Sequence, residues 1–177
     1  MDPYRIIKKY YDPKSKAYKR LITHGKIITK ISLKLAKKVE HLKPDIKFIK
    51  EAAILHDIGM YKCDAPTLNC YGKEPYIKHG VIGRKILEKE NLPIHAKVCE
   101  RHIGVGITKK EIIRNKLPLP KRNMIPISIE ERIIAYADKF HTKDKGINSI
   151  PFIRKRISKY GKENLKRFDE LHKLFKN

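Results

Sequence analysis

The chain has 177 residues, with 42 Lys and Arg against 19 Asp and Glu, which gives a formal net charge of +23 at pH 7. This length suits one domain with a substantial core. No stretch approaches the roughly 20 apolar residues of a membrane-spanning helix, and residues 1–16 lack the apolar centre of a signal peptide. We therefore expect a soluble, cytoplasmic protein without a membrane partner.

The positive charge has two interpretations. A concentrated basic surface would attract nucleic acid, whereas dispersed lysines give a solvated exterior. The 32 lysines are spread along the whole chain, so nucleic acid is a possible partner but not the favoured one. A small anionic substrate needs much less of this charge. Abundant lysine together with the absence of glutamine is also a tendency of thermophile proteins.

The first half of the chain predicts four helices in succession. A long amphipathic helix covers 15–40, and a second, with Pro44 in its first turn, runs to about 58. Residues 60–74 lack periodicity and are expected to form an irregular loop. A third helix spans 75–91, and a fourth runs from Pro93 to about His102. Within these regions, the odd cysteine set (Cys63, Cys70 and Cys99) favours reduced thiols, with a Cys63–Cys70 disulfide or zinc site as the alternative.

The second half continues the helical pattern. Thr108 and Glu111 match a capping box that opens a short helix, and Ser128 and Glu131 match a second box that opens the helix carrying Asp138. Residues 117–126 form a proline-punctuated loop, and two further helices cover 149–159 and 162–175. No segment shows the alternation of a strand. The prediction is an all-α, single-domain helical bundle over 1–177, with a core at about 20–142 and C-terminal helices at about 149–175.

Six side chains able to bind metal occupy positions where helical spacing predicts a buried apolar residue. They are His24, His56, Asp57, His79, His102 and Asp138. Around His24, for example, Leu21 and Ile28 lie one helical turn away on the same face. A buried imidazole or carboxylate must be hydrogen-bonded, paired or coordinated, because leaving it unpartnered costs several kcal/mol. Six such groups facing one core favour a metal centre over six separate hydrogen-bonding arrangements.

The remaining histidines fall outside this pattern. We interpret His41, His95 and His172 as surface residues. His141 lies one turn beyond Asp138 and is a candidate to support the site from behind. The tyrosines near the start of the chain (Tyr4, Tyr10, Tyr11 and Tyr18) are expected to pack in the core.

The ordered set of a helical His, the His-Asp pair in HDIG, two further histidines and an Asp in AYADKF resembles the HD-domain metal-dependent phosphohydrolases over about residues 20–142. The additional His79 and His102 resemble the binuclear branch, which includes cyclic-dinucleotide phosphodiesterases and diadenosine tetraphosphate hydrolases. The strings RHIGVGIT and SIEERIIAYADKF look most like a small, mostly archaeal HDIG family without an assigned reaction.

The resemblance implies a ligand set and a chemistry. One divalent transition metal (Fe, Mn, Co, Ni or Zn) would take His24, His56, Asp57 and Asp138, and a second would take Asp57, His79 and His102, with Asp57 bridging the two. Imidazole and carboxylate ligands suit these metals, and a water held between two such ions becomes a nucleophile near neutral pH. The expected reaction is hydrolysis of a phosphomonoester or phosphodiester of a nucleotide-like molecule by a metal-bridging hydroxide, with His56 and Asp57 as catalytic residues.

Two departures from these relatives bear on the substrate. Ile103 follows His102 where the cyclic-dinucleotide enzymes have a second His, and no Gly-Tyr-Pro string occurs, so cyclic dinucleotides are not expected. Met60 stands where many relatives have a phosphate-binding Lys. Lys62 is the candidate substitute. Arg101, near the end of the fourth helix, and Lys109, at the start of the next, are further candidates, because the backbone amides at the start of that next helix could also bind phosphate.

Two other functions stay open. One is a di-iron oxygenase of the HD fold, since six nitrogen and oxygen ligands are compatible with iron. The other is an RNA-binding or regulatory module in which the metal centre is structural. A requirement for O₂ would identify the first, and salt-dependent RNA binding would support the second. Neither the substrate nor the oligomeric state follows from the sequence.

Overall fold

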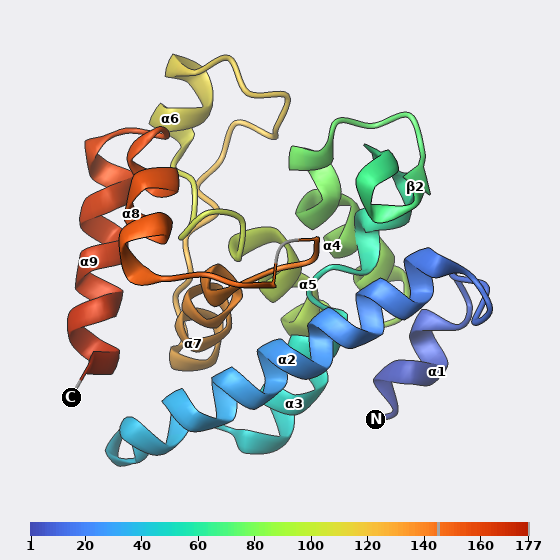
Figure 1. The fold of residues 1–177 in the computed structure, drawn as a ribbon, viewed down its shortest axis with the longest axis horizontal. Helices are drawn as coiled ribbons and strands as arrows, with labels where there is room; N and C mark the ends of the chain where they lie inside the picture. Colours follow the sequence, from blue (N-terminus) through green and yellow to red (C-terminus); the bar gives the residue numbers. More distant parts are fainter. Residues whose placement is uncertain (145, 177) are drawn as a thin grey trace.

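The computed structural model describes residues 1–144 and 146–176, and these residues are predominantly helical (Figure 1). The α-helices are α1 Pro3–Ile7, α2 Lys16–Lys38, α3 Ile46–Leu55, α4 His79–Lys89, α5 Pro93–Arg101, α6 Lys109–Arg114, α7 Ile129–Ala137, α8 Ile150–Ser158 and α9 Lys162–Lys176. Short 3₁₀ turns join them: η1 Glu40–Leu42, η2 Ile58–Lys62, η3 Pro66–Leu68, η4 Tyr76–Lys78 and η5 Asp138–Phe140. The all-α prediction is confirmed.

Two small antiparallel strand pairs interrupt the helices. β1 (Asp64–Ala65) pairs with β2 (Cys70–Tyr71), and β3 (His141–Thr142) pairs with β4 (Gly146–Ile147). The sequence predicted no strand in either place. A two-residue ladder is too short to show alternation, so the pattern could not have revealed it.

The helix starts follow side-chain capping, with two corrections. Helix α3 does not have Pro44 in its first turn, because Asp45 caps it by accepting from the Phe48 amide and the helix begins at Ile46. The predicted capping box at Thr108 and Glu111 is complete, with each side chain accepting from the other residue's amide.

The second predicted box is only half formed. Ser128 accepts from the Glu131 amide, but the Glu131 carboxylate accepts from the Ile127 amide at 2.6 Å and not from that of Ser128. Both oxygens of the Glu131 carboxylate also accept from the Arg101 guanidinium, at 2.8 and 3.0 Å. Glu131 is therefore held by Arg101 of α5 and by the Ile127 amide, and not by the Ser128 amide that a complete capping box would use.

Two clusters of apolar side chains meet at the centre of the molecule. Helix α2 packs along α3 and α7, while α4 pairs with α5 and crosses η2 (Figure 1). On α2, Leu21 belongs to the cluster formed with α1, α4 and α5, and Ile28 belongs to the cluster formed with α7, α8 and α9. His24 lies between these two residues on the same face, so it sits where the clusters join.

The N-terminal segment holds the HDIG region in place. Tyr11 is buried, and its hydroxyl donates to the Ile58 carbonyl at 3.0 Å and accepts from the Tyr61 amide at 3.0 Å. Tyr4, Tyr10 and Tyr18 pack against the same cluster, which confirms the expectation for these tyrosines. The three cysteines are free and buried, and no helix among the described residues is long and apolar enough to cross a membrane.

Candidate metal centre

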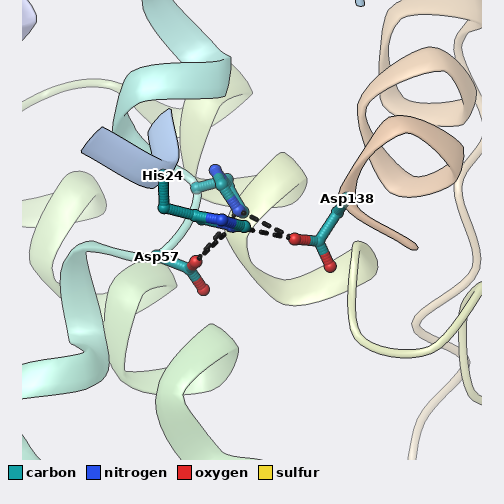
Figure 2. Close-up of side chains that lie close together, drawn as sticks. His24, Asp57 and Asp138 are labelled. Atoms are coloured by element: carbon teal, nitrogen blue, oxygen red, sulfur yellow. Dashed lines mark hydrogen bonds and ion pairs between the residues drawn. The ribbon is translucent and has the colours of Figure 1, made fainter. Parts of the chain in front are cut away.

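His24, His56, Asp57 and Asp138 form the first of two groups of possible metal ligands. Nε2 of His24 lies 3.0 Å from Oδ1 of Asp138 and 3.3 Å from Oδ2 of Asp57. Nε2 of His56 lies 3.0 Å from the same Asp57 oxygen. Figure 2 shows His24, Asp57 and Asp138 pointing toward one another from three separate elements.

Asp57, His79 and His102 form the second group. Oδ1 of Asp57 lies 3.1 Å from Nε2 of His79 and 3.4 Å from Nε2 of His102, and the two imidazole nitrogens are 3.1 Å apart. The two carboxylate oxygens of Asp57 thus face different groups, Oδ2 the first and Oδ1 the second. The sequence resemblance implied this same division, with Asp57 shared.

Helix ends bring these side chains to one place. His56, His102 and Asp138 are the C-terminal caps of α3, α5 and α7, and His79 is the first residue of α4. Of the six residues, only His24 lies in the interior of an α-helix, away from either end. Adjacent residues of a continuous helix point about 100° apart. His56 and Asp57 both reach the centre because α3 has ended and the chain turns into η2.

Gly59 allows η2 and α4 to touch backbone to backbone. A Cβ atom at this position would lie 2.1 Å from the His79 carbonyl oxygen and 2.5 Å from the Gly83 amide nitrogen. Real Cβ atoms do not approach backbone atoms so closely. The glycine of HDIG therefore sets the spacing that brings the start of α4, and with it His79, against Asp57.

Backbone carbonyls fix the orientation of three imidazoles. Nδ1 of His56, His79 and His102 donates to the carbonyl three residues earlier, at 2.7, 2.6 and 2.8 Å respectively. With the proton on Nδ1, Nε2 carries the lone pair that faces the centre. Each ring is thereby held in the tautomer that metal ligation requires.

The orientation of the His24 ring is fixed by another histidine and not by a backbone carbonyl. Its Nδ1 lies 2.8 Å from Nδ1 of His141, on β3. Burial, with help from the neighbouring His24, lowers the pKa of His141, which favours the neutral ring, and Nδ1 of a neutral His141 can accept a hydrogen bond from Nδ1–H of His24. His141 therefore supports the site from behind, as the sequence suggested, but it does so from a strand after η5 and not from the helix of Asp138.

The buried polar atoms at the centre fit a cation. Among the described residues, His56 Nε2 and both oxygens of Asp57 are buried without a partner in hydrogen-bonding geometry. Unpartnered buried acceptors are costly, and a metal ion satisfies them together. The donor set, four imidazoles and two carboxylates, suits divalent transition metals.

The electrostatics point the same way. Burial raises the pKa of Asp57, but His56 and Lys143 outweigh it and hold this pKa well below its ordinary value. Without metal, burial lowers the pKa of His56, but the carboxylates of Asp57 and Asp138 outweigh it and raise this pKa to about 9, so a metal that binds Nε2 must displace a proton from this ring. Burial lowers the pKa of His102 to about 4, which leaves this ring neutral. The centre therefore holds carboxylates that stay ionised and attract cations.

Two lysines that the sequence did not single out reach this centre. Lys143, in the β3–β4 loop, places Nζ 2.5 Å from Oδ2 of Asp57, and its side chain is only 11% exposed. Lys139 places Nζ 2.7 Å from Oδ2 of Asp138. Lysine is the commonest residue of the chain, so neither residue stands out by its type. Lys139 follows Asp138 within the string AYADKF, in which only the Asp was a predicted ligand, and Lys143 lies beyond that string.

A cleft of about 950 Å³ opens over the centre. His79, His102 and Asp138 line its floor, together with Lys139 and Lys143. Its walls come from residues 64–68, from the 103–107 turn and from α8. This volume lies near the upper end of the roughly 300–1,000 Å³ typical of small-molecule sites.

The three residues expected to bind substrate are not part of the described lining of the cleft. The Arg101 guanidinium is committed to Glu131, as described above. Lys62 is exposed and lies over the Tyr61 ring, 5.9 Å from its centroid. Lys109 is exposed at the start of α6. The structure brings Lys139 and Lys143 to the centre in their place.

The expectation that His95 lies on the surface is wrong. The residue is 9% exposed, its ring lies tilted against that of Phe48 with the centroids 4.7 Å apart, and it hydrogen-bonds to Glu51 at 3.2 Å. His41 is exposed, as expected, whereas His172 is half-buried and hydrogen-bonds to Tyr136 at 2.7 Å.

Sequence comparisons show which known proteins this chain is similar to. A sequence profile described as HD domain matches residues 21–143. An uncharacterized protein of Methanocaldococcus jannaschii is 34% identical over 154 residues, covering 81% of this chain and 82% of that protein. Two proteins named tRNA (cytidine(56)-2'-O)-methyltransferase are 33% identical (Picrophilus torridus) and 32% identical (Thermoplasma volcanium), covering 82% and 87% of this chain. The chain spans only 37% and 41% of the length of those two relatives. No solved structure matches the chain.

Proposed function

The chain belongs to the HD-domain family, and from this we propose that it is a metal-dependent phosphohydrolase. Its substrate is a phosphomonoester or phosphodiester of a nucleotide-like molecule. One observation carries the proposal: a shared carboxylate, Asp57, faces two groups of imidazole and carboxylate donors at the floor of an open cleft. Such an arrangement suits two metals that share a bridging ligand.

The proposed ligand roles follow the two groups. His24, His56, Asp57 and Asp138 hold one divalent transition metal, and Asp57, His79 and His102 hold the second. When bound, the two ions activate water and offset the charge of a phosphoryl group. The protein contributes the fixed orientation of the donors, through the carbonyls behind three histidines and through His141 behind His24.

We assign phosphate binding to Lys143 and Lys139, in place of Lys62. Both line the cleft, and both ammonium groups already neutralise carboxylates at its floor. Met60, which follows the HDIG string, is fully buried and cannot take this role. An ammonium in a largely desolvated cleft is weakly screened, so it contributes more to binding a phosphate than an exposed lysine such as Lys62.

RNA is the second candidate partner. Two relatives carry a name that specifies a tRNA-modifying activity, and this chain matches less than half of each. The named methyl transfer belongs to those whole proteins, so the present proposal takes from them only the class of molecule. Nucleic acid, which the even spread of lysines did not favour, is accordingly included among the substrates to be tested.

The experiment is a screen of protein loaded with Mn²⁺, Co²⁺, Fe²⁺, Ni²⁺ or Zn²⁺ against nucleoside mono-, di- and triphosphates, cyclic nucleotides, dinucleoside polyphosphates and short oligonucleotides. Released phosphate or shortened product is expected for at least one class. Loss of this activity in His24→Ala and Asp57→Ala together is expected, because the residues act as one unit. Each variant must first show wild-type circular dichroism.

Two outcomes would redirect the proposal. Turnover that needs O₂ in a matched anaerobic assay would replace hydrolysis with oxidative chemistry. Hydrolysis that persists with Mg²⁺ after transition metals are removed, and in Asp57→Ala, would locate the reaction outside this centre.

A further inference from the structure

Helix α8 (Ile150–Ser158) lines the cleft with both buried and exposed side chains. Ile153 and Ile157 belong to the lining but are buried in the main core, whereas Phe152 on α8 and Tyr160, two residues after its end, are 39% and 54% exposed. Aromatic rings that stay in solvent beside a polar site provide surfaces on which planar groups stack. Core packing therefore explains the two isoleucines but not the two rings.

Two cations, Arg156 and Lys159, lie between these rings in the chain. Arg156 lies one turn after Phe152, with its guanidinium carbon 5.7 Å from the ring centroid, and it donates to the Thr142 hydroxyl at 3.5 Å. Lys159 follows in the next turn and lines the same cleft. We call Phe152, Arg156, Lys159 and Tyr160 the α8 wall.

Acidic groups of the cleft lie elsewhere. Asp64 is on the wall formed by residues 64–68, and Asp144 is in the β3–β4 loop. Glu111, also in the lining, is neutralised by Arg167 at 2.8 Å. The α8 wall itself carries two cations and no carboxylate, so the ligand that it suits combines anionic groups with planar rings.

The surface continues beyond the cleft. A shallower depression of about 330 Å³ shares Asn115, Lys159 and Tyr160 with it and extends to Arg114 and Lys162. Figure 1 shows that the start of α9, which follows α8, lies near α6. From Phe152 to Ser158, the last residue of α8, six steps cover roughly 9 Å at about 1.5 Å per residue, and Lys159 and Tyr160 follow directly. A path that is open at its far end suits a strand better than a compact ligand.

We propose that the α8 wall binds a single-stranded oligonucleotide whose scissile phosphate lies at the metal centre. The bases next to that phosphate stack on Phe152 and Tyr160, and the following phosphates meet Arg156 and Lys159. Aromatic rings beside cations are typical of surfaces that bind single strands without reading sequence. The placement of the scissile phosphate at the metal centre rests on the proposed hydrolytic function, and the α8 wall narrows the substrate from a mononucleotide to a strand. RNA and DNA both offer the bases and phosphates that this binding requires.

The first test measures binding without turnover. Dye-labelled hexa-adenylate, as RNA and as DNA, is titrated with protein in chelator at about 0.15 M salt and followed by fluorescence anisotropy, with unlabelled AMP, pApA and hexa-adenylate as competitors. We expect hexa-adenylate to compete at least about tenfold better than AMP, with pApA between them, because each stacked base adds affinity. Equal competition by AMP and hexa-adenylate would overturn the proposal. RNA and DNA that differ strongly would show that the strand's sugar is also recognised.

The second test uses variants of α8. Phe152→Ala is expected to weaken hexa-adenylate binding about tenfold. Arg156→Ala is expected to weaken it and to make the slope of log affinity against log salt less negative by roughly 0.7, the loss of one phosphate contact on a single strand. Lys155→Ala is the matched control. Lys155 is exposed on the same helix but is not among the residues that line the cleft, so this substitution removes the same charge from outside the α8 wall. If Arg156→Ala and Lys155→Ala weakened hexa-adenylate binding equally, the α8 wall would contribute only its net charge, and the proposal would be contradicted.

A third measurement separates this proposal from the hydrolytic one. Metal-loaded protein is assayed on AMP, pApA and hexa-adenylate. Tight binding of hexa-adenylate that depends on the α8 wall, without any hydrolysis, would support strand binding and contradict the proposed hydrolytic function. Hydrolysis with rates and KM values that do not depend on strand length would support the hydrolytic function and contradict strand binding by the α8 wall.

Discussion

Lys143→Met tests how the charge of Asp57 is balanced. In protein stripped of metal by a chelator, the Lys143 ammonium, 2.5 Å from Oδ2 of a fully buried carboxylate, is the nearest cation to Asp57. Removing one partner of a buried ion pair typically costs about 3–5 kcal/mol. His56, whose pKa is raised to about 9, stays 3.0 Å from the same Asp57 oxygen and offsets part of this cost, so we expect about 3 kcal/mol, at the lower end of that range. For a chain of this length, the loss corresponds to a fall in Tm of roughly 6–12 °C.

The assay is thermal unfolding followed by circular dichroism, in chelator and again with saturating Mn²⁺. With metal, we expect the Tm difference between wild type and Lys143→Met to shrink to about 2 °C or less, since the ions then offset the Asp57 charge. Lys26→Met is the matched control, because Lys26 is exposed on α2 two residues from His24. A Lys143→Met protein that melts like Lys26→Met in chelator would refute the reasoning, as would a loss that metal leaves unchanged.

Three further predictions concern the supports of the site. Gly59→Ala should lower the free energy of unfolding by about 3 kcal/mol and weaken metal binding, measured by urea unfolding and calorimetric titration, because its Cβ would lie 2.1 Å from the His79 carbonyl. His141→Ala should weaken metal binding about 10- to 100-fold, with partial recovery in His141→Asn, because an acceptor behind His24 orients that ligand. Glu111→Gln should lower Tm at pH 7 and have a progressively smaller effect as the pH falls through the folded-state pKa of Glu111, in melts recorded from pH 7 to 3. Burial raises that pKa, but Arg167 and Thr108 outweigh it and lower it, so this stabilisation is present above the unfolded pKa and lost in acid.

Each of these has a control and a contradicting result. Gly25→Ala introduces a Cβ no closer than 3.1 Å to its neighbours, so it should be far milder than Gly59→Ala. Equal losses would show that η2 and α4 can separate freely. Normal metal affinity in His141→Ala would mean that His24 needs no partner. A Glu111→Gln deficit that stays constant down to pH 3 would assign the effect to packing and not to charge.

Helical periodicity predicted where the functional side chains lie. His24 interrupts an apolar stripe between Leu21 and Ile28, and the structure places all three on one buried face. His56, His102 and Asp138 were also expected on buried faces, and they lie at helix ends. The sequence predicted the end of α5 at about His102, but it placed the end of α3 at about 58, because helix ends depend on local capping and differ from pattern-based boundaries by a few residues. Their division into two groups came from the family resemblance, because spacing alone does not say which helices meet.

Tertiary contacts explain what the sequence did not reveal. Lys143 looks like any other lysine until the β3–β4 pair folds its loop onto Asp57. His95 was assigned to the surface although His95, Val98 and His102 follow helical spacing, and this face of α5 packs against α3. The assignment of 1–177 to one domain stays a prediction. Phe168 and Phe175 of α9 pack in the same apolar cluster as α2 and α7, which supports it.

Metal content tests the central claim most directly. Protein purified without chelator and then equilibrated with Mn²⁺ or Co²⁺ is passed through a desalting column, and metal per chain is determined by elemental analysis. The two-group centre predicts close to two ions per chain for wild type, about one for the double variant His79→Ala/His102→Ala, and loss of most of both for Asp57→Ala, since that carboxylate faces both groups. One ion per chain in wild type, unchanged in His79→Ala/His102→Ala, would contradict the binuclear account and leave a single-metal site at His24, His56, Asp57 and Asp138.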